Sequence, residues 1–120
     1  MTIRATSEHT KLAISMASKI TTNSETASQL ASIVGDCKDS YIDALDNLKE
    51  MMNALPSRDV GIMNSMLSAA IMDFSDCDDE FSGLNSPLLE FDAKLTKMTS
   101  NGLALIKLWS FIVVEVHIGC

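Results

Sequence analysis

The chain has few aromatic and few basic residues. Aromatic side chains make up 5% of its 120 residues, and Lys and Arg number 9 against 16 Asp and Glu, which gives a formal net charge of −7. Because the phosphate backbone of nucleic acids needs a basic surface, this balance argues against DNA or RNA as a partner. An acidic surface suits a basic protein partner better, although acidic residues also serve solubility alone.

The sequence also lacks a hydrophobic run long enough to span a membrane. A transmembrane helix needs about 20 consecutive apolar residues, and the most apolar stretch, LALIKLWSFIVVEVHIGC, is interrupted by Lys107, Glu115 and His117. The first residues, MTIRATSEHTKLAISM, show no apolar segment followed by a small-residue cleavage site, so no signal peptide is visible. We therefore expect no membrane partner.

Residues that could carry catalysis or bind a metal are equally scarce. The two histidines, His9 and His117, lie near opposite ends of the chain, and no Glu-x-x-His pair is present for a di-iron bundle. The acidic stretch DFSDCDDEF, residues 73–81, lacks the mid-loop Gly and the distal Glu of an EF-hand. Carboxylates around a thiol raise its pKa, which disfavours a catalytic Cys77. We predict no enzyme activity, no metal site and no cofactor.

Apolar residues recur at spacings of three or four along most of the chain, which is the pattern of amphipathic helices. Three strong stripes cover residues 30–55, 60–81 and 88–109, and a weaker one precedes them. The stripes are Ala13, Ala17, Ile20; Leu30, Val34, Cys37, Tyr41, Ala44, Leu48, Met51, Leu55; Val60, Met63, Leu67, Ala70, Phe74, Cys77, Phe81; and Leu88, Phe91, Leu95, Met98, Gly102, Leu105, Trp109. We predict an all-α fold, an antiparallel up-down four-helix bundle.

Polar residues and a proline mark the helix ends. Ser24 or Thr26 can cap the start of the second helix. Pro56 is expected to end that helix, because it disfavours a helical residue before it. Asp59 or Ser57 can then cap the third helix. The turn between the second and third helices is therefore short.

Two cysteines lie at matching distances from this turn. With its centre near Ser57, Cys37 comes twenty residues before it and Cys77 twenty residues after it. Antiparallel helices bring such positions face to face, and both cysteines belong to apolar stripes. They should meet within reach of an inter-helix disulfide, which would imply an oxidising compartment. Two buried free thiols are the alternative.

Acidic residues form a second periodic pattern, opposite the apolar stripes. The pattern comprises Asp39, Asp43, Asp46 and Glu50 on the second helix and Asp73, Asp76 and Glu80, with Asp79 beside them, on the third. Like charges four residues apart destabilise a helix slightly, so such a face needs an explanation. It is either a solvated face or a docking surface for a basic partner, for which charge gives association rate and specificity.

Three stretches of the chain together resemble one known family. CKDSYIDALDNL is similar to a Cys-x-x-x-Tyr-x-x-Ala-x-x-x-Leu signature, SAAIMDFSDCDDEF to a Ser-Ala-Ala-Leu motif followed by Thr-Cys-x-Asp-x-Phe, and SPLLEFDAKLTKMTSNGLALIKL to a last helix. These are motifs of the plant invertase and pectin methylesterase inhibitors. The resemblance covers residues 5–108, and the separation of the two cysteine motifs makes it fairly specific.

The resemblance implies a secreted, apoplastic four-helix bundle in which one disulfide joins the second and third helices. That pairing agrees with the Cys37–Cys77 bond inferred from the turn. Members of the family inhibit invertase or pectin methylesterase through a 1:1 complex that blocks the active-site cleft. By position relative to the two cysteines, the resemblance assigns partner binding to five acids: Asp39, Asp43, Asp46, Asp76 and Asp79. Asp76 stands where the family usually has Thr.

The chain also departs from the family pattern. The N-terminal extension with its own cysteine pair is missing, and no Pro-Lys-Phe motif precedes Cys37, which leans slightly against invertase as the target. We divide the chain into an inhibitor-like bundle at 1–108 and an atypical, strand-like hydrophobic tail at 109–120, which adds Cys120. The alternative to an inhibitor is a non-inhibitory relative resembling a pollen protein, or an inactive truncated product.

Overall fold

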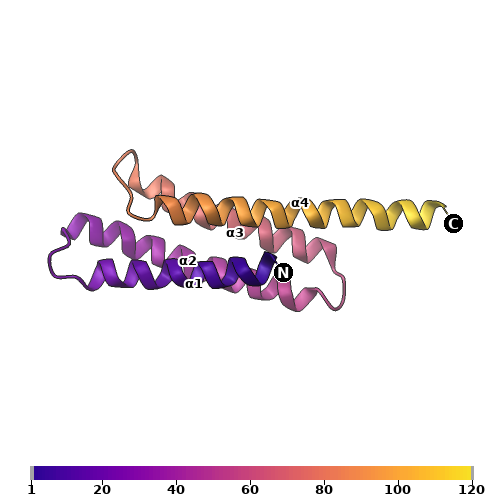
Figure 1. Ribbon diagram of the computed structural model, residues 1–120, viewed down its shortest axis with the longest axis horizontal. Helices are drawn as coiled ribbons and strands as arrows, with labels where there is room; N and C mark the ends of the chain where they lie inside the picture. The colour runs from indigo at the N-terminus through magenta and orange to yellow at the C-terminus, as the bar shows by residue number, and fades with distance from the viewer. Residues whose placement is uncertain (1, 120) are drawn as a thin grey trace.

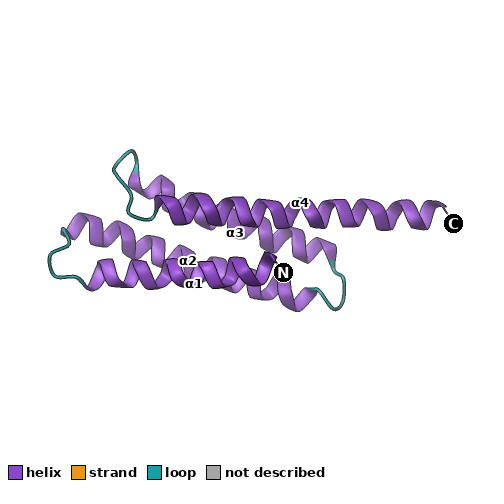
Figure 2. Ribbon diagram, in the orientation of Figure 1, coloured by secondary structure: helices purple, strands orange, loops and turns teal. Residues whose placement is uncertain are grey.

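Four antiparallel helices form the protein, and each packs against two neighbours. The computed structural model describes residues 2–119, and the side chains of residues 3–109. The helices are α1 (Thr2–Thr22), α2 (Ser28–Ala54), α3 (Val60–Phe81) and α4 (Leu89–Gly119). α2 contacts α1 and α3, and α4 contacts α3 and α1, so the helices close a ring (Figure 1). Residues 2–119 contain no strand (Figure 2), and the predicted all-α bundle is confirmed.

The interface between α2 and α3 is the most extensive in the bundle and follows the predicted stripes. Every stripe residue on these two helices is buried except Leu30, Leu55 and Val60 at the ends, which are half-buried. The rings of Tyr41 and Phe74 lie 6.2 Å apart between centroids. The short turn and the two apolar stripes therefore set the register that the sequence predicts.

A disulfide locks this register. Cys37 and Cys77 are bonded, with their Cα atoms 4.7 Å apart, and both side chains are fully buried. The predicted inter-helix disulfide is confirmed over the alternative of two free thiols. Cys120, the third cysteine, lies outside the described residues.

The buried row of α4 differs from the predicted one. The structure buries Asp92, Thr99 and Ile106 where the apolar pattern predicts Phe91, Met98 and Leu105. Leu105 is 57% exposed. The Thr99 hydroxyl donates to the Leu95 carbonyl oxygen at 2.7 Å, and Asp92 has a donor on α2, so burial leaves neither group without a hydrogen bond. Hydrophobicity alone could not reveal a core row with polar members.

Small and polar residues also form the inner face of α1. Its buried row is Ile3, Thr6, Thr10, Ala13 and Ala17. The Thr10 hydroxyl donates to the Thr6 carbonyl oxygen at 2.8 Å, so it is satisfied within the helix. On α4, a Cβ added at Gly102 would lie 3.0 Å from the Ile3 side chain, so glycine allows α1 and α4 to approach closely. The apolar stripe of α1 is weak in the sequence because most of the buried residues of this helix are small or polar.

The predicted caps are right for α3 and wrong for α2. The Asp59 carboxylate accepts a hydrogen bond from the Ile62 backbone N–H at 3.1 Å, as an N-cap residue does. Ala27, and not Ser24 or Thr26, precedes α2, and its side chain provides no cap. The packing of α2 against α1 and α3, rather than a cap, therefore fixes where this helix begins.

α2 ends at Ala54, just before Pro56 as the sequence predicts, but the conformation of Leu55 differs from the prediction. Leu55 is helical, with φ −56° and ψ −47°, although Pro56 follows it. The Arg58 N–H donates to the Leu55 carbonyl at 3.1 Å, and the Asp59 N–H donates to the Ala54 carbonyl at 3.4 Å. These two bonds form a Schellman motif, which closes the helix end and offsets the steric preference of the residue before proline.

The segment predicted to be a strand-like tail is helical. α4 runs without a break to Gly119 and extends beyond the other three helices (Figure 1). β-branched residues cost a helix no more than about 0.7 kcal/mol each, so a helix already formed on the bundle can continue through them. The division of the chain at residue 108 stays a prediction. As far as the chain is described, none of its helices combines the length and hydropathy that a membrane crossing requires.

Replacing Cys37 and Cys77 together by Ser should lower the free energy of unfolding by about 2–5 kcal/mol, because the unfolded chain regains the freedom of a closed loop. The comparison is made in a chain that also carries Cys120→Ser, so that no third thiol can exchange. Urea unfolding followed by circular dichroism measures the loss. A double variant as stable as the Cys120→Ser control would show that the disulfide is dispensable to the fold.

Candidate functional site

The disulfide-linked helices carry the five acids that the sequence analysis selected for partner binding. We call Asp39, Asp43, Asp46, Asp76 and Asp79 the acidic face. All five side chains are exposed, three on α2 and two on α3. In the antiparallel register that pairs Cys37 with Cys77, Asp39 lies at the level of Ser75, one residue from Asp76. The structure thus places the five acids on one pair of helices fixed to each other.

No cation of the described part of the chain neutralises the acidic face. Within residues 3–109, the one ion pair joins Lys11 to Glu8 on α1, at 3.1 Å between nitrogen and oxygen. Repulsion among the acids therefore remains uncompensated by the fold. Unpaired surface charge of one sign creates a field that extends about 8 Å into physiological salt, and such a field attracts a basic surface.

Asp73 lies half-buried between α2 and α3, next to the acidic face. The Asn47 side-chain amide donates to an Asp73 carboxylate oxygen at 3.1 Å. Burial, assisted by the adjacent Asp43 carboxyl and by Asp76, raises the pKa of Asp73 to about 7, although the Asn47 hydrogen bond opposes the rise. At mildly acidic pH the Asp43–Asp73 pair therefore holds a proton, which reduces repulsion between the two helices.

A second carboxyl pair is buried beside the disulfide. Asp92 of α4 is completely buried, and the Tyr41 hydroxyl of α2 donates a hydrogen bond to its Oδ1. The Tyr41 oxygen also lies 3.5 Å from the Cys77 sulfur. The remaining oxygen of Asp92, Oδ2, and Oδ1 of Asp78 on α3 are both buried without a hydrogen-bond donor. We call Tyr41, Asp78 and Asp92 the buried acid cluster.

A proton on Asp92 allows its Oδ2 to donate a hydrogen bond to Oδ1 of Asp78, so that neither oxygen is left without a partner. Burial, assisted by the neighbouring Asp78 carboxyl, raises the pKa of Asp92 to about 8, although the Tyr41 hydrogen bond opposes the rise. Burial and the hydrogen bond to Asp92 likewise raise the pKa of Tyr41. Because an isolated buried carboxylate is costly, Asp92 is protonated at neutral pH and can share its proton with Asp78. The cluster then joins α2, α3 and α4 through polar contacts.

Sequence reasoning missed this cluster, although the sequence contains a signal for it. Asp92 lies between Leu88 and Leu95 at spacings of four and three, so it continues a helical row into which a carboxylate normally does not fit. Asn47 and Asp73 gave no comparable signal, because their contact depends on the register of α2 and α3.

The histidines, the other residues that could carry catalysis or bind a metal, do not belong to the acidic face or the buried acid cluster. His9 packs against Phe91, with 5.5 Å between ring centroids, and burial, assisted by Lys94, lowers the pKa of His9. Among the described residues, no three His, Cys, Asp or Glu side chains come together as metal ligands would. His117 lies where side chains are not described.

A model of one protein family covers most of the chain. The family, described as "Plant invertase/pectin methylesterase inhibitor", matches residues 1–105. The chain belongs to this family. The resemblance carried by the two cysteine motifs is thereby confirmed, and with it the general class of protein inhibitors.

Two relatives support the assignment. A protein from Platanus orientalis, named "Putative invertase inhibitor", is 31% identical over 106 residues, which cover 81% of this chain. The chain spans 62% of the length of that curated relative. The crystal structure of a pectin methylesterase inhibitor from Arabidopsis thaliana matches with a TM-score of 0.79 and 22% identity, covering 88% of this chain and 72% of that one. The two chains share the helical-bundle fold.

Asp92→Asn should make the stability of the chain depend less on pH. The folded-state pKa of Asp92 is about 8, above the value of about 3.9 for an unfolded Asp. The wild-type contribution is therefore fully present below about pH 4 and is lost as the pH rises through about 8. Asparagine keeps an acceptor for Tyr41 and a donor for Asp78 but has no proton to lose.

Urea unfolding at a series of pH values measures this difference. Each proton retained on folding contributes a slope of at most about 1.4 kcal/mol per pH unit, and Asp92→Asn should remove one such proton. The half-buried Asp73 leaves a residual slope of the same sign, because its folded-state pKa is also raised. The exposed Asp46→Asn serves as the control. Parallel profiles for Asp92→Asn and wild type would contradict the assignment of the proton.

Proposed function

We propose that the chain is a non-catalytic inhibitor that binds a pectin methylesterase or an acid invertase of the plant cell wall in a 1:1 complex. In this proposal the acidic face contacts a basic surface at the rim of the enzyme's active-site cleft and blocks access to it. The observation that carries the proposal is an exposed, unneutralised set of five acids on a disulfide-linked helix pair, in a chain of this inhibitor family.

Rigid presentation of the acids favours binding. Asp39 is two residues from Cys37, and Asp76 and Asp79 flank Cys77, so the disulfide fixes their backbones relative to one another. A surface that is ordered before binding loses less conformational entropy in the complex. Unpaired charges on such a surface speed the encounter with an oppositely charged partner and discriminate against acidic ones.

The names of the two relatives support two enzymes as possible targets of the chain. The Platanus relative is named for invertase, and the solved Arabidopsis structure is that of a pectin methylesterase inhibitor. Secretion into the apoplast belongs to the same proposal and has two supports. The Cys37–Cys77 bond is typical of oxidising compartments. The raised pKa values of Asp73 and Asp92 favour the folded state at acidic pH.

Titrating residual enzyme activity with the purified, oxidised chain at mildly acidic pH tests the proposal. We expect activity of one of the two enzymes to fall linearly to an end point at one molecule of chain per molecule of enzyme. That enzyme is then the target. A folded chain that inhibits neither enzyme would instead be a non-inhibitory member of the family.

Neutralising Asp43 and Asp46 together should weaken binding of the target enzyme. We expect Asp43→Asn with Asp46→Asn to raise the dissociation constant about tenfold, mainly through slower association, because the removed charges steer the encounter. Surface plasmon resonance at low and high salt measures both rates. The difference between variant and wild type should shrink at high salt.

Glu8→Gln with Glu25→Gln provides the matched control. It changes the net charge equally but alters exposed residues of α1 and of the α1–α2 loop, outside the acidic face. We expect this control to bind like wild type. If both double variants weakened binding equally, general charge rather than the acidic face would account for the affinity, and if neither weakened binding, the acidic face would not be the binding surface.

A further inference from the structure

An apolar groove lies at the end of the bundle formed by the α2–α3 turn and the start of α1. Its main cavity, of about 380 Å³, is lined by Leu55, Arg58, Met63, Leu105, Ile106 and Trp109. A second cavity, of about 300 Å³, adjoins it at Leu55 and reaches Ile3 and Arg4. We call the two together the Arg58 groove. The acidic face plays no part in it.

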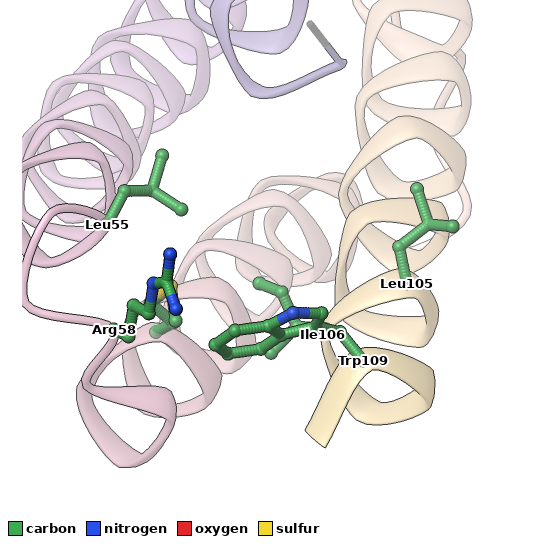
Figure 3. Close-up of a pocket in the computed structure, with 6 residues that line it drawn as sticks. Leu55, Arg58, Leu105, Ile106 and Trp109 are labelled. Carbon is green, nitrogen blue, oxygen red and sulfur yellow. The ribbon is translucent and has the colours of Figure 1, made fainter. Parts of the chain in front are cut away.

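Aromatic and cationic side chains converge on the mouth of this groove. In Figure 3 the Trp109 ring extends from α4 toward the α2–α3 turn, where the Arg58 side chain rises along the opposite side of the cavity. Leu55 and Leu105 line the cavity from opposite sides in the same view (Figure 3). Small-molecule sites typically have this composition, with apolar walls, one or two polar groups and a volume of about 300–1,000 Å³.

The charge of the groove is opposite to that of the protein. The chain has a net charge of −7 and contains two arginines, Arg4 and Arg58. Both line the groove, and no acidic residue lines either cavity. Among residues 3–109, the Arg58 guanidinium has neither an ion pair nor a hydrogen bond. The groove therefore presents a planar cation that no described residue pairs with, and such a cation is the group best suited to pair with a carboxylate.

The fold itself gives no reason for arginine at position 58. Arg58 has φ of 54°, in the left-handed region, at the position of a Schellman motif that glycine usually occupies. A residue with a side chain is strained there, because its Cβ lies close to the following carbonyl oxygen, and this strain costs free energy. Since its side chain pairs with nothing in the described part of the chain, this cost is not recovered within the fold. Such strained positions cluster at ligand-binding sites.

We propose that the Arg58 groove binds a small amphipathic carboxylate, a molecule with one carboxylate group and an aliphatic or aromatic body. Arg58 pairs with the carboxylate, Arg4 adds positive potential, and the body packs against Trp109, Leu105 and Ile106. This site is distinct from the proposed enzyme-binding surface, because no residue of the acidic face lines it. Asp46, the member of the acidic face nearest the turn, lies nine residues before Leu55, about 14 Å along α2.

Octanoate is a suitable probe, and Trp109 is a built-in reporter because it is the one tryptophan of the chain. We expect octanoate to change the tryptophan fluorescence of the full chain in a saturable way, and 1-octanol, which lacks the charge, to bind at least about tenfold more weakly. Arg58→Gly should weaken octanoate binding by about tenfold or more and leave 1-octanol binding unchanged.

Arg58→Gly is informative because glycine suits the backbone at this position. Its unfolding midpoint in urea should equal or exceed that of wild type, so lost binding cannot come from lost folding. Lys97→Gln, which removes an exposed cation of α4 outside the groove, should bind octanoate like wild type. Unsaturable fluorescence, equal affinity for octanoate and 1-octanol, or an Arg58→Gly variant that binds octanoate normally would each overturn the proposal.

Discussion

The fixed register between α2 and α3 is the constraint on which the rest of the molecule depends. Two apolar stripes and a short turn align the helices, and the Cys37–Cys77 bond prevents them from sliding. Tyr41 extends this constraint to a third helix, because its hydroxyl lies beside the Cys77 sulfur and donates to Asp92 of α4. The acids on the outer surface of α2 and α3 consequently project from two helices whose relative position the disulfide fixes.

Two carboxyl pairs give the bundle a common response to pH. Asp43 with Asp73, and Asp78 with Asp92, bring like charges together at a half-buried and a buried site, where a shared proton is worth more than in water. Both pairs favour the folded state in acid. The chain can thus keep charged carboxylates on its surface while the carboxyls packed between its helices are protonated.

The sequence allowed the central helix pair to be predicted but not the packing of α4. Register and disulfide followed from apolar periodicity and turn length, which are local properties of residues 30–81. The inward position of Asp92 depends on Tyr41, a partner fifty-one residues away, so periodicity favoured the more apolar row instead. Likewise, the left-handed Arg58 depends on hydrogen bonds that close the turn. The acidic face was accessible to sequence reasoning because the five positions that the family motifs selected are among the eight acids that charge periodicity selected.

Carboxyl labelling of the chain, free and bound to its target enzyme, tests most directly whether the acidic face is the binding surface. A carbodiimide with an amine reagent modifies exposed carboxylates, and mass spectrometry locates the modified residues. We predict that Asp39, Asp43, Asp46, Asp76 and Asp79 are labelled in the free chain and protected in the complex, whereas Glu8 and Glu25 are labelled in both. An inhibited complex in which the five acids stay reactive would contradict the account.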